Sequence, residues 1–185
     1  MGFSKILLGL FGWKAVVNIK GDIPPKAVVL TVPHTSYWDF FIGFFTYKAL
    51  GLNARYLIKQ EAFFFPLGNL IKSIGGIPVR RGKNNVVKDV VKEINNNDNF
   101  LLTIAPEGKR TAQLTWKTGY HRIAREANVP VIVGFIDYKT KTCGMQDVFF
   151  TTDDFEKDTI ELMKYYKNME GRIKEGFILP DEVYK

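Results

Sequence analysis

The chain has 185 residues, of which 46% are hydrophobic and 24% charged, so it is long enough for one domain with a packed core and is not typical of a disordered protein. A single cysteine, Cys143, excludes an intrachain disulfide and a zinc site of paired cysteines, and two widely separated histidines argue against a histidine-rich metal site. The net charge of +7 favours an anionic partner, such as nucleic acid, anionic lipid, a phosphorylated small molecule or an acidic carrier protein.

The 15 phenylalanines narrow this choice because many of them cluster, at residues 40–45 and 63–65. Nucleic-acid surfaces interleave aromatic residues with Lys and Arg, so the clusters favour an apolar pocket or a membrane-facing surface. No uncharged apolar run approaches the ~18–20 residues that span a bilayer, and no signal-peptide cleavage site follows the apolar run 6–13. We therefore expect a cytoplasmic chain that touches the inner face of the membrane without crossing it.

Residues 3–18 place Phe3, Ile6, Leu7, Leu10 and Val17 at helical spacing, which predicts an amphipathic first helix. This helix either packs on the core or lies at a membrane interface, flanked by lysines. We place a boundary after residue 22, so that residues 1–22 carry the N-terminal helix and residues 23–185 form the main domain.

The rest of the chain alternates between strand and helix patterns. Short apolar runs predict strands at residues 27–32, 54–58, 77–80, 100–104, 130–138 and 141–150, the last two joined at Lys139-Thr140. Helices are predicted at residues 38–50, 66–74 and 117–127. Another helix is predicted to begin at a cap on Asn84 and to end at residues 95–97. The last helix is predicted to begin at a cap on Thr152 or Asp153 and to carry one apolar stripe, formed by Leu162, Tyr166, Met169 and Ile173. The alternation predicts a single α/β domain with a mainly parallel sheet and flanking helices.

The first candidate site lies after the first of these strands, at His34 and Asp39. On one regular helix the two would point about 140° apart, but they can meet if His34 lies in the turn and Asp39 in the first helical turn. That turn follows the carboxyl end of a strand, where open α/β sheets bind ligands. An imidazole oriented by a carboxylate is a general base near neutral pH; the alternative is an ordinary loop histidine beside an acid.

Two basic segments follow later strands. Arg80 and Arg81 end one strand, where they either bind a phosphate or carboxylate or form a solvated turn. The second segment, Ala105 to Thr111, combines Gly108 with Lys109 and Arg110, but it does not have the pattern of a Walker loop.

Taken in order, these segments resemble the glycerolipid acyltransferase family that includes the 1-acyl-glycerol-3-phosphate acyltransferases. His34 and Asp39 match the family's first motif, His-x4-Asp, and Gly76 to Arg81 match the second motif. The third motif is matched by Pro106-Glu107-Gly108-x-Arg110 and the fourth by Val129 to Ile132. Lys59 lies where family members carry a basic residue between the first and second motifs. The resemblance spans about residues 27–137. Any one motif is weak, but four in order are specific.

The resemblance implies an O-acyltransferase that moves a fatty acyl chain from acyl-CoA or acyl carrier protein, as co-substrate and without a cofactor or metal, to a lyso-lipid hydroxyl. His34 would be the general base and Asp39 its orienting acid. Lys59, Arg81 and Arg110, with Lys109 as a fourth cation, would hold the anionic headgroup. Gly76, Pro106, Glu107 and Gly108 would support the motifs, with backbone N–H groups near Gly108 or Gly76 as oxyanion donors.

Two alternatives to a phosphate lyso-lipid acceptor stay open. One is an O-acyltransferase for a lyso-lipid with a carboxylate headgroup, such as an acylated amino-acid lipid. The other is a basic nucleic-acid-binding module without catalysis, whose affinity would fall steeply with salt and would not need His34. We expect no nucleic-acid partner, because the aromatic residues are clustered rather than interleaved with basic ones.

Overall fold

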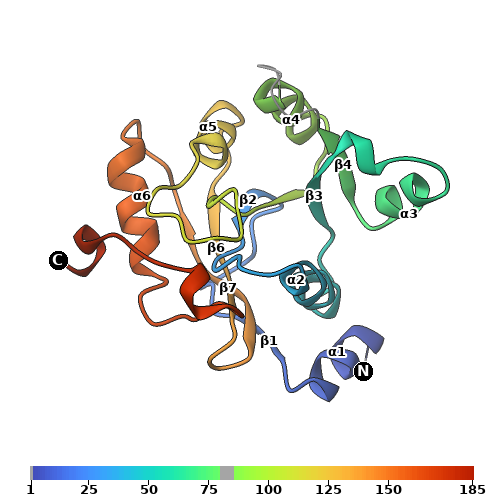
Figure 1. The fold of residues 1–185 in the computed structure, drawn as a ribbon. Coiled ribbons are helices and arrows are strands. Elements are labelled where there is room, and N and C mark those ends of the chain that lie inside the picture. Colours follow the sequence, from blue (N-terminus) through green and yellow to red (C-terminus); the bar gives the residue numbers. More distant parts are fainter. Residues whose placement is uncertain (1, 80–85) are drawn as a thin grey trace.

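The computed structural model describes residues 2–79 and 86–185, with only the backbone of Lys59. Its centre is a seven-stranded sheet in the order β1-β7-β6-β2-β5-β3-β4 (Figure 1). The strands are β1 (Lys14–Val17), β2 (Lys26–Leu30), β3 (Ala54–Lys59), β4 (Gly76–Val79), β5 (Phe100–Ile104), β6 (Val131–Asp137) and β7 (Thr142–Phe149). All neighbouring pairs are parallel except β6 and β7, which form an antiparallel hairpin. The predicted mainly parallel α/β fold is therefore confirmed.

Helices cover both faces of this sheet because successive residues of a strand point to opposite sides. In β2, Val28 and Leu30 join a core cluster with residues of α4, α5 and α6, whereas Ala27 and Val29 join a cluster with Tyr47 of α2 (Figure 1). The helices are α1 (Phe3–Leu10), α2 (Trp38–Ala49), α3 (Leu67–Ser73), α4 (Val86–Asn95), α5 (Gly119–Glu126) and α6 (Phe155–Lys164), with 3-10 turns at Gln60–Ala62, Lys174–Gly176 and Asp181–Tyr184. A two-sided core of this kind explains why the strands are continuous apolar runs.

The predicted strands between residues 27 and 150 and the predicted helices between residues 38 and 127 agree with the structure to within about two residues where they are described. The predicted cap Asn84 and the end of the predicted strand at Arg80 lie outside the described residues.

The predicted helix over residues 3–18 is wrong beyond Leu10. The chain leaves α1 through Gly12, whose φ of +77° is open to glycine at little cost, and Lys14–Val17 forms β1, parallel to β7. A β-branched pair at the end of an apolar run suits an edge strand as well as a helix, and pairing with β7 decides the outcome. The sheet therefore includes residues on the N-terminal side of the boundary placed after residue 22.

The last helix also differs from its prediction. Asp154, and not Thr152 or Asp153, caps α6 by accepting a hydrogen bond from the Lys157 backbone N–H at 3.0 Å. The Thr152 hydroxyl instead donates to buried Asp158 at 2.9 Å. Tyr166, Met169 and Ile173 of the predicted stripe lie outside α6, which ends at Lys164. The segment after this helix returns across the carboxyl edge of the sheet.

Candidate active site

The site lies where several parallel strands end at one edge of the sheet. The strands β2, β5 and β6 are neighbours and parallel, so the segments that follow them meet there: His34 after β2, Glu107 after β5 and Tyr138 after β6. Open α/β sheets bind their ligands at this edge because loops from adjacent strands converge on it.

Asp39, in the first turn of α2, is buried and held in place by three hydrogen bonds. Its Oδ2 atom accepts from the backbone N–H groups of Thr35 and Ser36, each at 2.8 Å, and its Oδ1 atom accepts from the Tyr138 hydroxyl at 2.6 Å. These bonds compensate for burial of the carboxylate, and the two backbone donors also fold the turn that carries His34. The carboxylate therefore has one orientation.

The structure brings His34 and Asp39 together, as the spacing allows. The Nδ1 atom of His34 lies 3.2 Å from Oδ2 of Asp39, within ion-pair distance, although its alignment is not that of a full hydrogen bond. The His34 side chain is 25% exposed, whereas that of Asp39 is fully buried. Because Nδ1 faces the acid, Nε2 is the nitrogen left to meet a substrate.

Glu107 explains how the third motif supports the first. Its side chain is buried, and its Oε2 atom accepts a hydrogen bond from the His34 backbone N–H at 3.0 Å. Burial raises the pKa of Glu107 to about 8, with a further increase from the negative charge of Asp39, while the hydrogen bond from His34 acts in the opposite direction. Glu107 thus ties the loop after β5 to the turn that carries His34.

A cavity of about 180 Å³ opens beside the pair. Its wall includes His34 and Asp39, Phe40 and Gly43 of α2, and residues of β3 and β5. A substrate group in this space would contact the imidazole directly.

Three of the four cations predicted to bind the headgroup are among the described residues, and they lie at the carboxyl edge of the sheet. Arg110 is exposed, and its guanidinium lies 3.5 Å from the ring centre of Tyr37, three residues after His34. Lys109 is exposed beside it. Lys59 is the last residue of β3, at the carboxyl edge. Arg81 lies outside the described residues.

The two candidate oxyanion glycines have other roles in the structure. Gly76 begins β4, at the strand end away from His34, and a Cβ there would meet Ile71 at 2.4 Å, so this glycine permits close packing of α3. Gly108 has a φ of +71° and its N–H donates to the Ala105 carbonyl at 3.2 Å, which closes the turn. An oxyanion donor near Gly108 or Gly76 therefore stays a prediction. Pro106, the other residue expected to support the third motif, is buried, and its carbonyl accepts a hydrogen bond from the Lys117 N–H at 2.8 Å.

The sequence analysis missed two residues beside the pair of His34 and Asp39. Tyr138 could have been found, because it directly follows a predicted strand at the carboxyl edge. Arg172 carries no local signal, yet its guanidinium lies 5.2 Å from the ring centre of Trp38. In the same turn, Thr35 accepts a hydrogen bond from the Ile173 N–H at 3.2 Å. Ser36 accepts one from the Trp38 N–H at 3.2 Å.

Comparison with known proteins shows the family and the fold. Residues 15–135 match the protein family described as Acyltransferase. The fold is similar to the crystal structure of the 1-acyl-sn-glycerophosphate (LPA) acyltransferase PlsC from Thermotoga maritima, with a TM-score of 0.60 and 17% sequence identity over 89% of this chain and 74% of that one. No curated protein matches the sequence.

The chain therefore belongs to the acyltransferase family, and it is an acyltransferase enzyme. The glycerolipid acyltransferase family expected from the four ordered motifs is confirmed. This assignment favours an enzyme over the alternative of a binding module without catalysis.

Proposed function

We propose that the enzyme moves a fatty acyl chain from an acyl thioester to the hydroxyl of a lyso-lipid, with 1-acyl-glycerol-3-phosphate as the acceptor. The observation that carries this proposal is the partly exposed His34 beside the buried Asp39, on the wall of a cavity. A neutral alcohol attacks a thioester slowly until a base removes its proton, and His34 is the base this cavity provides.

The reaction needs one general base that later acts as an acid. Nε2 of His34 takes the hydroxyl proton as the acceptor oxygen bonds to the thioester carbonyl carbon. When the tetrahedral intermediate collapses, the C–S bond breaks and the imidazolium returns the proton to the thiolate. Asp39 stabilises the imidazolium and holds the ring through its contact with Nδ1.

We propose direct transfer, with acyl-CoA or acyl carrier protein as co-substrate and no further cofactor. The single cysteine is a poor nucleophile, because Cys143 is buried in β7 and burial raises the pKa of its thiol to about 12. An acyl-enzyme on this cysteine is therefore disfavoured.

The test is an assay of the purified chain with acyl-CoA or acyl carrier protein and a panel of lyso-lipids, with products identified by mass spectrometry. Esterified 1-acyl-glycerol-3-phosphate is the expected main product. Transfer only to an acylated amino-acid lipid would identify a carboxylate acceptor instead. No ester product with any acceptor would contradict the proposal.

Arg110 is expected to bind the anionic headgroup of the acceptor. Replacing it with alanine should lower kcat/KM for the phosphate acceptor about ten- to hundredfold, because a charge-assisted contact contributes ~1.5–3 kcal/mol. The measurement is steady-state kinetics with the acceptor and the thioester varied in turn. Arg122→Ala, which removes an exposed arginine from α5, is the matched control and should be neutral. A normal acceptor KM in Arg110→Ala, or a defect in the thioester KM alone, would assign Arg110 to the donor.

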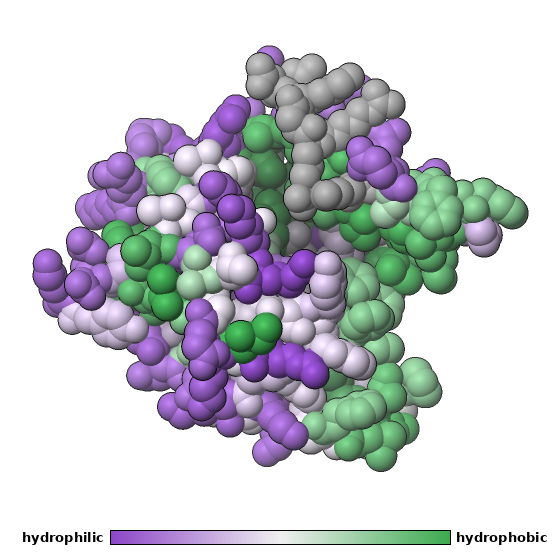
Figure 2. All heavy atoms as spheres, in the orientation of Figure 1, coloured by the Kyte–Doolittle hydropathy of each residue, from purple (hydrophilic) through white to green (hydrophobic). Residues whose placement is uncertain are grey.

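We also propose that the enzyme binds peripherally to the inner face of an anionic membrane, where cytoplasmic acyl donors meet lipid acceptors. Exposed apolar side chains gather on the flank formed by α1 and α3 (Figure 2). They are Phe3, Ile6, Leu10, Phe64, Phe65, Leu67 and Leu70. Lys5 on α1 and Lys72 on α3 are exposed beside them, and each basic residue near an anionic surface adds ~1 kcal/mol. In the described part of the chain, no helix is long and apolar enough to cross a bilayer.

Replacing both Phe3 and Leu10 with serine should weaken binding to anionic vesicles at least tenfold. The two side chains are 74% and 77% exposed, and each change removes apolar surface from the membrane interface. Vesicle flotation measures the bound fraction. Phe150→Ser, at an equally exposed residue after β7, is the control and should bind normally. Equal recovery of wild type and the double variant with vesicles would show that α1 serves the fold alone.

A further inference from the structure

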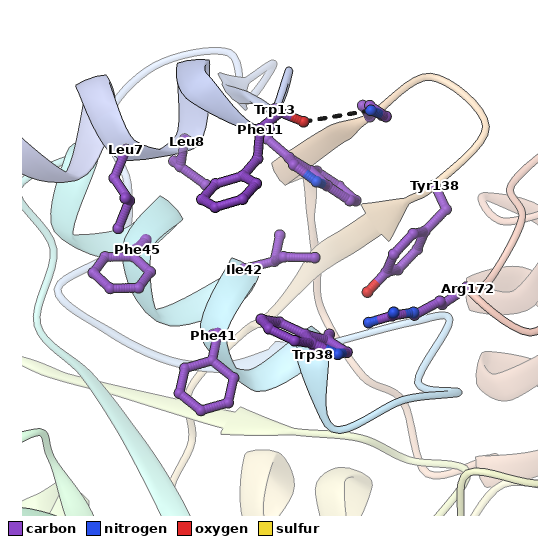
Figure 3. A pocket seen from close by; sticks show the side chains of 11 residues that line it. Leu7, Leu8, Phe11, Trp13, Trp38, Phe41, Ile42, Phe45, Tyr138 and Arg172 are labelled. Carbon is purple, nitrogen blue, oxygen red and sulfur yellow. Dashed lines mark hydrogen bonds between the residues drawn. The ribbon is translucent and has the colours of Figure 1, made fainter.

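A second, larger cavity lies on the other side of α2 from the catalytic pocket, between α1 and α2 (Figure 3). Its volume of about 400 Å³ is within the range of small-molecule sites. The walls are almost entirely apolar: Leu7 and Leu8 of α1 face Trp38, Ile42 and Phe45 of α2. Such a space suits an acyl chain, which has no polar groups to satisfy.

Two cations line this cavity, Arg172 and Lys141, and the Nζ atom of Lys141 donates a hydrogen bond to the Phe11 carbonyl at 3.4 Å. Arg172 marks one end of the cavity. The guanidinium of Arg172 points toward it beside the Trp38 ring (Figure 3), and no acid among the described residues lies within ion-pair distance of Arg172. Arg110 stacks on the neighbouring ring, Tyr37, at the start of the same helix. A ligand that fills the cavity therefore meets positive charge at this end, which favours an anionic headgroup.

The backbone on both sides holds Arg172 in place. The Glu170 N–H donates to buried Asp137 at 3.0 Å, and the Ile173 N–H donates to Thr35 at 3.2 Å. Gly171 packs so closely on Thr35 that a Cβ would approach its Cγ2 atom to 2.5 Å. Arg172 is thus positioned by the same turn that carries His34.

Tyr138 links this cavity to the pair of His34 and Asp39. The ring of this tyrosine lines the cavity next to Arg172 (Figure 3), while its hydroxyl donates to Asp39 at 2.6 Å. A chain lying in the cavity with its headgroup at Arg172 would end beside the group that orients the base.

We propose that this cavity binds the acyl chain of an anionic lyso-lipid acceptor, and that Arg172 binds its headgroup together with Arg110. The inference deepens the proposed function by assigning the acceptor, rather than the acyl donor, to a site of its own. The ligand class is a single-chain lipid with a phosphate headgroup.

Binding can be measured without turnover, because Trp13 and Trp38 line the cavity and a brominated acyl chain quenches tryptophan fluorescence on contact. The probes are 1-(bromododecanoyl)glycerol-3-phosphate and its neutral analogue without phosphate, both below their micelle concentrations. We expect saturable quenching by the anionic probe, with an affinity ten- to hundredfold above that of the neutral one. Arg172→Ala should lower this preference, because Arg110 alone then meets the headgroup, and should leave affinity for the neutral probe unchanged.

Two variants complete the design. Ile42→Phe adds bulk inside the cavity and should weaken binding of both probes, whereas Arg122→Ala on α5 should bind both normally. Quenching that does not saturate, or that is unchanged in both Arg172→Ala and Ile42→Phe, would overturn the site. In turnover assays Arg172→Ala should raise the acceptor KM and not the thioester KM; the reverse result would place the donor here and overturn the assignment.

This experiment also separates the inference from the proposed function. If the wild-type enzyme transfers no acyl chain but binds the probe in a way that depends on Arg172, the proposed function is contradicted and the lipid site is retained. Normal transfer without probe binding in the cavity would retain the function and overturn the site.

Discussion

Replacing His34 with alanine is expected to lower kcat about 10²–10⁴-fold, because this range is the contribution of a positioned general base. The imidazole is partly exposed on the cavity wall, and its Nδ1 atom lies 3.2 Å from the Asp39 carboxylate. The fold should survive, since Glu107 and Asp39 hold the turn through backbone N–H groups that alanine retains. Turnover of acyl thioester and lyso-lipid, followed by mass spectrometry, measures the effect.

The control for this variant is His121→Ala, which removes the other histidine. His121 is buried and pairs with Asp158 at 3.0 Å, on the α5 and α6 side of the sheet. Its loss should lower stability and leave kcat per folded molecule near the wild-type value. If His34→Ala, shown to be folded by circular dichroism, kept a tenth or more of the wild-type rate, the general-base assignment would be wrong.

Replacing Glu107 with glutamine should change the pH dependence of stability. Burial raises the pKa of this carboxyl from 4.5 to about 8, so between these pH values the unfolded chain loses the proton while the folded chain keeps it. The contribution of Glu107 to stability is therefore complete below pH 4.5 and is lost as the pH rises toward 8, by up to ~1.4 kcal/mol per pH unit. Glutamine cannot ionise and keeps an oxygen that can accept the His34 N–H.

The measurement is urea unfolding of wild type and Glu107→Gln at several pH values from 4 to 9. The stability of the variant relative to wild type should rise by several kcal/mol across this range, and subtracting the two curves cancels the groups that they share. Glu126→Gln, at a partly exposed acid of α5, should give a flat difference. A flat difference for Glu107→Gln as well would show that the pKa of Glu107 is not raised in the folded chain.

The sequence alone was sufficient for the strands β2 to β7 and for the residues of the first motif, because these depend on local information. Apolar runs bounded by turns determine buried strands, and the alternation with helices leaves parallel pairing as the way to connect them. The turn from His34 to Asp39 follows from the same logic, since only a bend between the two lets residues five positions apart meet. Tyr138 was accessible to the same reasoning, because it follows a strand that ends at this edge.

The partners of the turn from His34 to Asp39 were decided only by the tertiary structure. Glu107 binds the His34 backbone across 73 positions, Tyr138 binds Asp39 across 99, and Ile173 binds Thr35 across 138. The strand β1 was missed for the same reason, because Lys14–Val17 fits a helix by periodicity and becomes a strand by pairing with β7. Local sequence patterns carry no information on contacts of this range, which form when the segments after β2, β5 and β6 are packed together at one edge of the sheet.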